Sequence, residues 1–314
     1  MSHKTLIGGT AYNITGGKTL VNGTGYSIKS GTTLVNGTAY SINFGADVSP
    51  VLNDNDWATI SEVSQSGQAS NYWSVGDTKE IVIDGMVGQT TFSNLSIWAF
   101  IVGFDHNAAI EGYNTIHFQI GKSAQTNGKS LCLIDSQYNS NVSNTSGYFN
   151  MNYVYSNQGG WKSSQMRTVL LGNNNTPISP LSGSLTAALP SELRSVMKSV
   201  KKYSDNTGGG SDTASYVTST TDYLWMLAEY EVYGLRKYAN SAEQNYQAQY
   251  DYYANGNSKV FYRHSQTTST ANWCMRSAHA NGGNSSGFCY VTVGGGSRNG
   301  SAITSSGLAP AFCV

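Results

Sequence analysis

The sequence has few charged residues, few cysteines and no long hydrophobic run. Only 11% of its 314 residues are charged, and 18 acidic residues balance 18 basic ones. Nucleic acids and anionic membranes attract clusters of positive charge, so the composition predicts neither as a partner. The longest nearly apolar run, residues 95–104, is shorter than the roughly 18 residues that span a bilayer. It predicts a buried strand and no membrane insertion.

Cysteine spacing and the first residues bear on the cell compartment. The four cysteines, Cys132, Cys274, Cys289 and Cys313, lack the CxxC spacing of zinc sites and redox pairs. We expect buried free thiols, with a Cys274 to Cys289 disulfide as the alternative. The residues after Met1 are polar and Gly-rich, unlike a secretory signal, so we expect synthesis in a bacterial cytoplasm.

Small polar residues and tyrosine are abundant instead. The chain has 35 Gly and 21 Tyr, and it is also rich in Ser, Thr and Asn. Tyr, Ser, Gly and Asn are typical of adaptable binding surfaces. They are equally typical of a β-rich protein with many turns, and composition does not choose between the two.

Three consecutive copies of a 14-residue repeat fill residues 4–17, 18–31 and 32–45. Each copy has an apolar pair, then Gly-Gly or Asn-Gly, then a Tyr-x-Ile segment, which predicts a strand, a tight turn and a strand. So few large apolar side chains do not form a self-sufficient core. We expect residues 1–45 to attach the chain to a larger assembly or to drive oligomerisation. Packing on the downstream domain is the alternative.

Residues 46–314 are expected to form one domain that contains both strands and helices. Short strands and Asn, Gly and Ser turns dominate. Residues 189–203 change to a helical period, with Leu193, Val196 and Met197 on one side and basic residues up to Lys202 on a solvated face. A flexible loop at 204–211 and a buried strand at 222–227 are expected to follow. This order predicts an α+β domain that is mostly β.

Short motifs spread in order over about residues 50–314 carry a family resemblance. They are Trp73-x-x-Gly76-Asp77, Gly160-Trp161-x-x-Ser164-x-Met166-Arg167, Leu189-Pro190, the stretch from Lys198 to Lys202, Asp222-x-Leu-Trp-x-Leu with Glu229-Tyr230, Trp273-x-x-Arg276-Ser277, and Gly307-x-Ala309-Pro310-x-Phe312. This series resembles an uncharacterised domain, of the DUF6273 type, in phage and bacterial surface proteins.

The resemblance implies a fold and a setting. That domain is similar to the C-type-lectin-like fold of the formylglycine-generating sulfatase modifiers and of phage receptor-binding proteins diversified by retroelements. The N-terminal repeats resemble those at the start of phage tail or baseplate proteins. Together they imply a virion protein whose N-terminus attaches to the particle and whose head, residues 46–314, is C-type-lectin-like.

Catalytic signatures are missing from the sequence. The formylglycine-generating relatives use a reactive cysteine pair, and no two cysteines here are close in sequence. The five His residues occur without an HExxH, GxSxG or P-loop pattern. We interpret His106, which follows an apolar strand, as a neutral structural residue, and residues 53–56 lack the spacing of a calcium loop. We therefore predict no enzyme activity, no cofactor and no metal.

The candidate ligand-binding residues lie near the C-terminus. Trp273, Arg276, Pro310 and Phe312 are interpreted as framework, with Arg276 bonded to backbone carbonyls. Around them lie polar and aromatic residues that the resemblance places in an exposed variable stretch: Tyr262, Arg263, His264, Asn272, His279, Asn281, Asn284, Ser285, Ser286, Arg298 and Asn299. Ordinary turn residues of a β-rich surface are the alternative interpretation.

The sequence thus favours a phage virion protein, a tail-tip or fibre component that recognises a host surface glycan or protein. Retroelement diversification of the head is compatible with this hypothesis. The expected partners are the host receptor, other virion proteins that bind residues 1–45, and further copies of the chain in a trimer. The alternatives are an enzymatic head of the formylglycine-generating type and a non-adhesive decoration protein.

Overall fold

The computed structural model describes residues 48–126, 128–133, 144–264 and 267–314 in full, and within residues 1–47 it describes strands only. The chain divides into two compact units, Met1–Pro50 and Val51–Val314. None of the described helices is long and apolar enough to cross a membrane.

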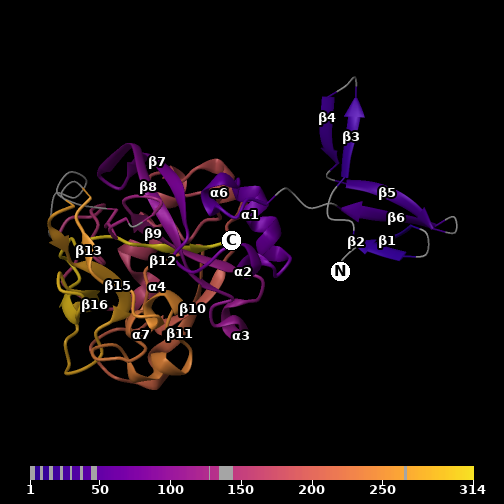
Figure 1. Cartoon of the computed structure of the whole chain (residues 1–314). Coiled ribbons are helices and arrows are strands. Elements are labelled where there is room, and N and C mark those ends of the chain that lie inside the picture. Colours follow the sequence, from indigo (N-terminus) through magenta and orange to yellow (C-terminus); the bar gives the residue numbers. More distant parts are fainter. Residues whose placement is uncertain are drawn as a thin grey trace. The chain divides into compact units, whose positions relative to one another are not determined.

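The N-terminal unit contains three separate antiparallel strand pairs, one for each sequence repeat (Figure 1). The pairs are β1 (Lys4–Ile7) with β2 (Thr10–Asn13), β3 (Gly17–Val21) with β4 (Thr24–Ile28), and β5 (Ser30–Val35) with β6 (Thr38–Asn43). The expected two-residue turns at 8–9, 22–23 and 36–37 lie outside the described residues.

The second unit is a mostly β, α+β domain built on a curled antiparallel half-barrel sheet. The strand order is β12-β18-β9-β8-β7. The strands are β7 (Thr78–Val87), β8 (Thr90–Phe104), β9 (Ile116–Lys122), β12 (Leu224–Trp225) and β18 (Ala311–Cys313). The buried strand expected at residues 95–104 is confirmed as the second part of β8. The C-terminal strand β18 lies between β9 and β12, so the end of the chain forms an inner strand of the sheet (Figure 1).

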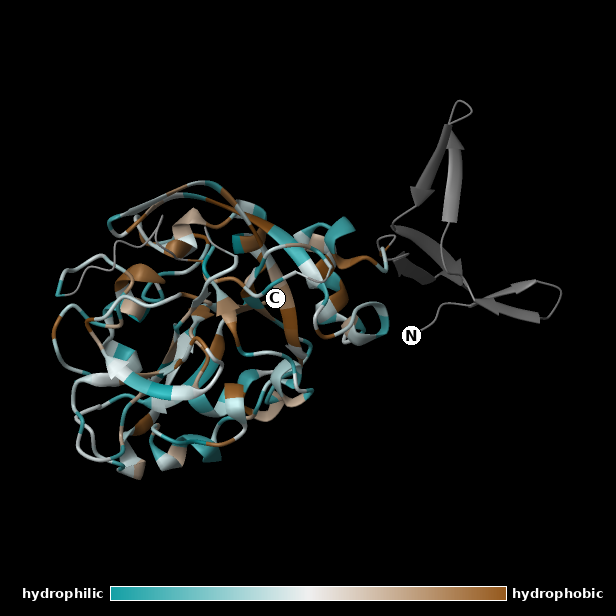
Figure 2. Cartoon of the chain, turned by 60° about the vertical axis from the view of Figure 1, so that its left-hand side comes forward, coloured by the Kyte–Doolittle hydropathy of each residue, from teal (hydrophilic) through white to brown (hydrophobic). Residues whose placement is uncertain are grey.

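Aromatic rings hold the first helix against this sheet. Asp56 is the N-cap of helix α1 (Trp57–Gln65), and its carboxylate accepts a hydrogen bond from the Thr59 amide. The Trp57 ring meets the Phe118 ring edge-on at 5.6 Å and the Phe312 ring at 5.8 Å. Figure 2 shows hydrophobic residues concentrated on the inner strands, with hydrophilic residues in the turns around them.

Smaller sheets and short helices complete the domain. The remaining strands are β10 (Val200–Asp205) paired with β11 (Val217–Asp222), β13 (Phe261–Tyr262) paired with β14 (Thr270–Ala271), and the sheet of β15 (Trp273–Ala278), β16 (Gly287–Val291) and β17 (Ser297–Ser301). The short helices are η1 (Leu52–Asp54), α2 (Ala69–Tyr72), α3 (Ala108–Glu111), α4 (Gly160–Ser163), η2 (Met166–Leu170), α5 (Leu185–Ala188), α6 (Ser191–Val196), η3 (Ala214–Tyr216), α7 (Glu229–Tyr233), η4 (Ser241–Asn245) and α8 (Asp251–Ala254).

The prediction of a long helix at residues 189–203 is wrong for its second half. Helix α6 ends at Val196, and the Lys198 amide then donates to the Cys313 carbonyl. From Val200 the chain is strand β10, paired with β11. Tertiary pairing therefore overrides the local helical period, and Lys202 is buried rather than on a solvated face.

Two neighbouring expectations also need correction. The loop expected at 204–211 begins with Ser204 and Asp205, which are buried at the end of β10. The strand expected at 222–227 is interrupted at Tyr223. The amides of Tyr223 and Leu224 both donate to the Asn173 side-chain oxygen, so they are not available for one continuous strand.

We predict that residues 51–314 fold without the first unit, because that unit and the larger domain are separate in their internal contacts. A protein that begins at Val51 should give one cooperative thermal transition close to that of the full chain, measured by circular dichroism. Aggregation, or a loss of cooperativity, would show that the strand pairs are part of the domain core.

Candidate functional site

A turn after β8 brings His106 and Glu111 to the inside of the domain. Asp105 and Asn107 both have left-handed backbone conformations, with φ of 47° and 48°, which Asp and Asn tolerate better than most residues. The chain then forms the single turn of α3, which ends with the buried Glu111. His106 Nδ1 lies 3.3 Å from Glu111 Oε2, and His106 Nε2 lies 2.9 Å from the Ala248 carbonyl.

Lys202 connects this turn to two other elements. Its ammonium on β10 lies 2.5 Å from Glu111 Oε2 and 3.2 Å from Glu231 Oε1 of α7. Glu231 also accepts two hydrogen bonds from the Arg276 guanidinium of β15, at 2.5 and 2.8 Å. The two cations and two carboxylates form a charge-balanced cluster, the ionic core, in which every side chain is almost fully buried.

The carboxylates of the ionic core stay ionised despite their burial. Burial is the largest single influence on Glu111 and would raise its pKa, but the Lys202 ammonium together with His106 and His117 outweighs burial and holds the pKa at about 2. Burial opposes ionisation of Glu231 too, and Arg276 and Lys202 keep its pKa far below the usual range. His117 has the opposite behaviour, because burial lowers its pKa well below the ordinary value and leaves the ring neutral.

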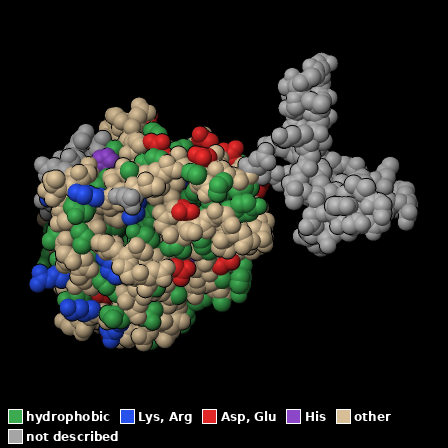
Figure 3. Space-filling model, in the orientation of Figure 1, with side chains coloured by type: hydrophobic (Ala, Val, Ile, Leu, Met, Phe, Trp, Pro, Cys, Tyr) green, Lys and Arg blue, Asp and Glu red, His purple; other side chains and the backbone are tan. Residues whose placement is uncertain are grey.

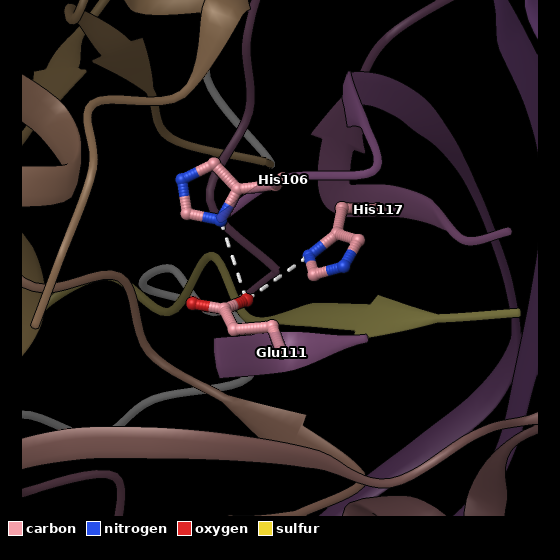
Figure 4. Close-up of side chains that lie close together, drawn as sticks. All are labelled: His106, Glu111 and His117. Atoms are coloured by element: carbon pink, nitrogen blue, oxygen red, sulfur yellow. Dashed lines mark hydrogen bonds and ion pairs between the residues drawn. The ribbon is translucent and has the colours of Figure 1, made fainter. Parts of the chain in front are cut away.

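Three of these side chains have the residue types of a metal site. Figure 4 shows the rings of His106 and His117 directed at the Glu111 carboxylate, and one atom from each of the three lies within 4.8 Å of the others. The Glu111 oxygen that faces both rings is the one that Lys202 contacts at 2.5 Å. A divalent cation would have to displace this ammonium, so the geometry favours the ionic core over a metal centre.

A second buried network leads from the ionic core toward the surface. Asp205, three residues after Lys202, accepts hydrogen bonds from the amides of Thr207 and Gly208 and from the Asn240 side chain. Its own amide donates to Glu243, which also accepts a hydrogen bond from Ser277. Burial raises the pKa of Glu243 to about 7. The glycine loop at 208–210 is therefore held by buried side chains.

Asn157 joins that glycine loop to the loop between β15 and β16. Its side-chain oxygen accepts from the Gly209 amide at 2.9 Å, and its side-chain nitrogen donates to the carbonyls of His279 and Gly287. Gly208 has φ of +69°, and a Cβ there would lie 2.0 Å from the Asn157 carbonyl oxygen. Only glycine fits at this position.

Large apolar side chains are exposed beside this anchor. Tyr153, Val154 and Tyr155 are 48, 50 and 67% exposed. Asn152 closes the loop at its base, because its side chain donates to the Ser156 carbonyl and its amide donates to the Ala302 carbonyl. The segments 151–158, 279–286 and 300–306 together make one hydrogen-bonded surface, which we call the loop face.

The structure brings together some of the sequence-predicted residues. His279, Asn281, Asn284, Ser285 and Ser286 lie in the loop face. Asn281 and Ser285 are exposed, whereas His279 and Ser286 are buried, and Asn284 accepts hydrogen bonds from Ser286. We therefore expect Asn281 and Ser285 to be accessible to a ligand and the other three to shape the loop.

The other predicted residues occupy neighbouring elements. Asn272 precedes β15 and accepts from the Val293 amide. Arg298 and Asn299 lie on β17, opposite Tyr290 and Cys289 of β16. Tyr262, Arg263 and His264 lie on β13 or directly after it, and the Tyr262 amide donates to the Ser130 carbonyl. Tyr262, Arg263 and His264 therefore belong to a different hairpin from the loop between β15 and β16.

The framework interpretation of Trp273, Arg276, Pro310 and Phe312 is supported by burial, because all four are buried. Arg276 does bond to the Met226 carbonyl at 2.9 Å, as expected, but its shortest contact is to Glu231. All four cysteines are buried free thiols. Sequence reasoning kept the loops around residues 137–157, which contain the exposed tyrosines, as the next candidate site. It missed the buried roles of Glu111, Lys202 and Asn157, although Lys202 lies in one stretch of the family resemblance.

A cavity of about 520 Å³ lies between β7, the start of α1 and the segment of α5 and α6. The carboxylates of Asp56, Glu80, Asp84 and Glu192 line it, with Lys79 as the one basic side chain among its lining residues. Figure 3 shows acidic side chains gathered over β7 and α6, and most Lys and Arg side chains toward β13, β16 and α7. On the face shown in Figure 3, most acidic side chains therefore lie apart from most basic ones.

Comparison with known proteins gives one match. The sequence model of a family described as a domain of unknown function (DUF6273) matches residues 130–314. The matched part is more than half of the chain and includes β10, α7, β15 and the loop face. Searches of curated proteins and of solved structures gave no match.

We predict that Lys202→Met lowers the free energy of unfolding by about 3–5 kcal/mol, because it leaves the buried Glu111 carboxylate without its ammonium partner. Adding Glu111→Gln should recover part of the loss by removing the unpaired charge. Urea unfolding of the single and double variants measures both effects. The control is Lys201→Met on the same strand, where the side chain is exposed and a change within about 0.5 kcal/mol is expected. Equal losses for Lys202→Met and Lys201→Met would contradict a stabilising ionic core.

A further prediction concerns how Glu243 makes the stability of the domain depend on pH. Its folded pKa of about 7 is above the ordinary value of 4.5, so its contribution to stability is complete below pH 4.5 and is lost as the pH rises through 7. Glu243→Gln keeps the shape and removes the titration. The variant should therefore gain stability relative to the wild type as the pH rises from 4.5 to 7.

Urea unfolding of both proteins over this pH range provides the measurement. His117, whose lowered pKa makes stability fall as the pH falls below 6.5, is present in both proteins, so its effect largely cancels in the difference. A difference that stays constant with pH would show that Glu243 does not titrate in this range.

Proposed function

The chain belongs to the DUF6273 family, whose description assigns no activity, and we propose that it is a binding protein that holds its ligand on the loop face. The proposed setting is the tail tip or fibre of a phage, where the protein recognises a surface glycan or protein of the bacterial host. The virion location and the C-type-lectin-like assignment of the head rest on the motif and repeat resemblances.

The observation that carries the proposal is the exposed run of Tyr153, Val154 and Tyr155. Aromatic side chains dominate the energetics of binding surfaces, and Tyr supplies contact area at a low cost in side-chain entropy. The loop that presents the three side chains is fixed at its base by Asn152 and the adjoining segment by Asn157. A rigid presentation of exposed aromatic groups lowers the entropy lost on binding.

The raised pKa values of the cysteine thiols argue against the alternative of an enzymatic head. A thiol reacts as the thiolate, and burial raises the pKa of Cys274 and of Cys313 to about 12. Burial also raises the pKa of Cys289 well above its usual range. The acidic and basic groups of the ionic core are paired with one another, which suits a structural role better than proton transfer to a substrate.

The N-terminal strand pairs complete the proposal. Among the described residues, each pair is a two-stranded sheet, and an isolated two-stranded hairpin is at best marginally stable in water. We propose that residues 1–45 bind other virion proteins or further copies of the chain, with a trimer as the expected oligomer. Several heads on one particle would strengthen weak binding by about 10² to 10⁴ when the sites are engaged together.

The test replaces Tyr153 and Tyr155 together with Ala in the full chain. Binding to a panel of bacterial strains and to an array of bacterial surface glycans should weaken about ten-fold or more, as expected for aromatic anchors of an interface. The melting temperature should stay nearly constant, because both side chains are largely exposed.

Tyr113→Ala provides the matched control, since Tyr113 is 71% exposed and lies between α3 and β9, outside the loop face. Normal binding by the Tyr153 and Tyr155 double variant would exclude the two tyrosines as the binding anchor and remove the observation that carries this proposal. Absence of binding to every strain and glycan, by the wild type as well, would favour a non-adhesive decoration protein.

A further inference from the structure

A cavity of about 180 Å³ lies between the loop face and the sheet of β15, β16 and β17. Met151, which directly precedes the exposed tyrosine loop, forms one wall, and Phe288 of β16 forms another. Of the lining residues, Met151, Ser301 and Thr304 belong to the segments of the loop face. Backbone hydrogen bonds from the Asn152 amide to the Ala302 carbonyl and from the Ala302 amide to the Ser286 carbonyl join those segments to one another. The cavity is therefore continuous with the surface to which we assign ligand binding.

The chemistry of the walls is polar but uncharged. Asn272, Ser301, Thr304 and Ser306 contribute amide and hydroxyl groups, and among the described residues that line the cavity none is charged. A charged ligand group would lose its hydration here without gaining an ion pair. The walls therefore favour a ligand that carries several neutral hydrogen-bonding groups.

One of these hydroxyls lacks a partner. The Ser301 side-chain oxygen is buried and has no hydrogen-bond partner among the described residues. Buried polar atoms are nearly always hydrogen-bonded, and leaving one unpaired is unfavourable. A ligand hydroxyl or amide in the cavity would supply the missing partner.

An aromatic ring completes the walls. The Tyr290 ring packs against Gly300, where a Cβ would lie 2.7 Å from the ring atom Cε1. Glycine at position 300 thus lets the ring lie directly over the strand backbone. An aromatic ring and apolar side chains next to hydroxyl groups suit the mixed apolar and polar faces of a sugar ring.

We propose that this cavity, the neutral pocket, binds one uncharged monosaccharide unit of a surface glycan. Its volume is below the roughly 300–1,000 Å³ of pockets for drug-sized ligands, which limits the occupant to one small ring. The inference rests on the proposed binding function and specifies the ligand class. A single neutral sugar has few atoms, so we expect an affinity in the millimolar range.

The experiment uses saturation-transfer NMR on the full chain with pairs of matched sugars. Glucose, galactose and N-acetylglucosamine are the neutral probes, and glucuronic and galacturonic acid are the charged counterparts. At least one neutral sugar should give a transfer signal, and its uronic acid should give a clearly weaker one. Ser301→Ala should weaken binding about three- to ten-fold, the effect of one lost hydrogen bond.

Thr304→Tyr should abolish the signal, because the exposed Thr304 can carry a larger side chain that fills the pocket without disturbing the core. Thr91→Tyr, at another exposed position on β8, is the matched control and should bind normally. The proposal is overturned if no neutral sugar gives a signal, if the uronic acids bind equally well, or if Thr304→Tyr and Ser301→Ala bind like the wild type.

The outcome is separable from that of the proposed function. Cell binding that depends on Tyr153 and Tyr155, with no sugar signal, would remove the neutral pocket and leave the loop face as a protein-binding surface. A sugar signal that is sensitive to Thr304→Tyr, with cell binding that does not depend on the tyrosines, would retain the pocket and remove the aromatic anchor.

Discussion

The position of Lys202 between two carboxylates is the constraint on which the rest of the domain depends. Its partners Glu111 and Glu231 come from α3 and α7, and Arg276 of β15 shares Glu231. Four elements that are distant in the sequence each contribute one charge to a buried cluster of zero net charge. Because an unpaired charge is costly in the interior, an arrangement that moved any of these elements out of place would leave a buried charge without its partner.

This arrangement extends to the surface through β10. Asp205 ends the strand that carries Lys202, and its carboxylate fixes the start of the glycine loop. That loop bonds Asn157, which in turn bonds the loop between β15 and β16. Charge pairing in the interior and the shape of the loop face are therefore parts of one hydrogen-bonded structure, although no ion pair of the core reaches the loop face itself.

Sequence reasoning reached the features that have a local period and missed those that depend on distant pairing. The strand in β8 and the mostly β class follow from short-range patterns. Lys202 does not, because its neighbours match a helical period and only the pairing of β10 with β11 buries it. The candidate binding residues predicted near the C-terminus include Asn281 and Ser285, which lie in the loop between β15 and β16. Asn157, more than a hundred residues earlier, had no local signal to connect it with that loop.

Asn157 holds the loop between β15 and β16 through carbonyl oxygens, at His279 and Gly287, and every amino acid has a carbonyl oxygen. The scaffold therefore imposes little on the identity of exposed side chains such as Asn281 and Ser285. Substitutions at these positions would alter the recognition chemistry while the backbone of the loop keeps its course. A domain of this kind separates the residues that maintain its shape from those that select its ligand, so the two can diverge at different rates.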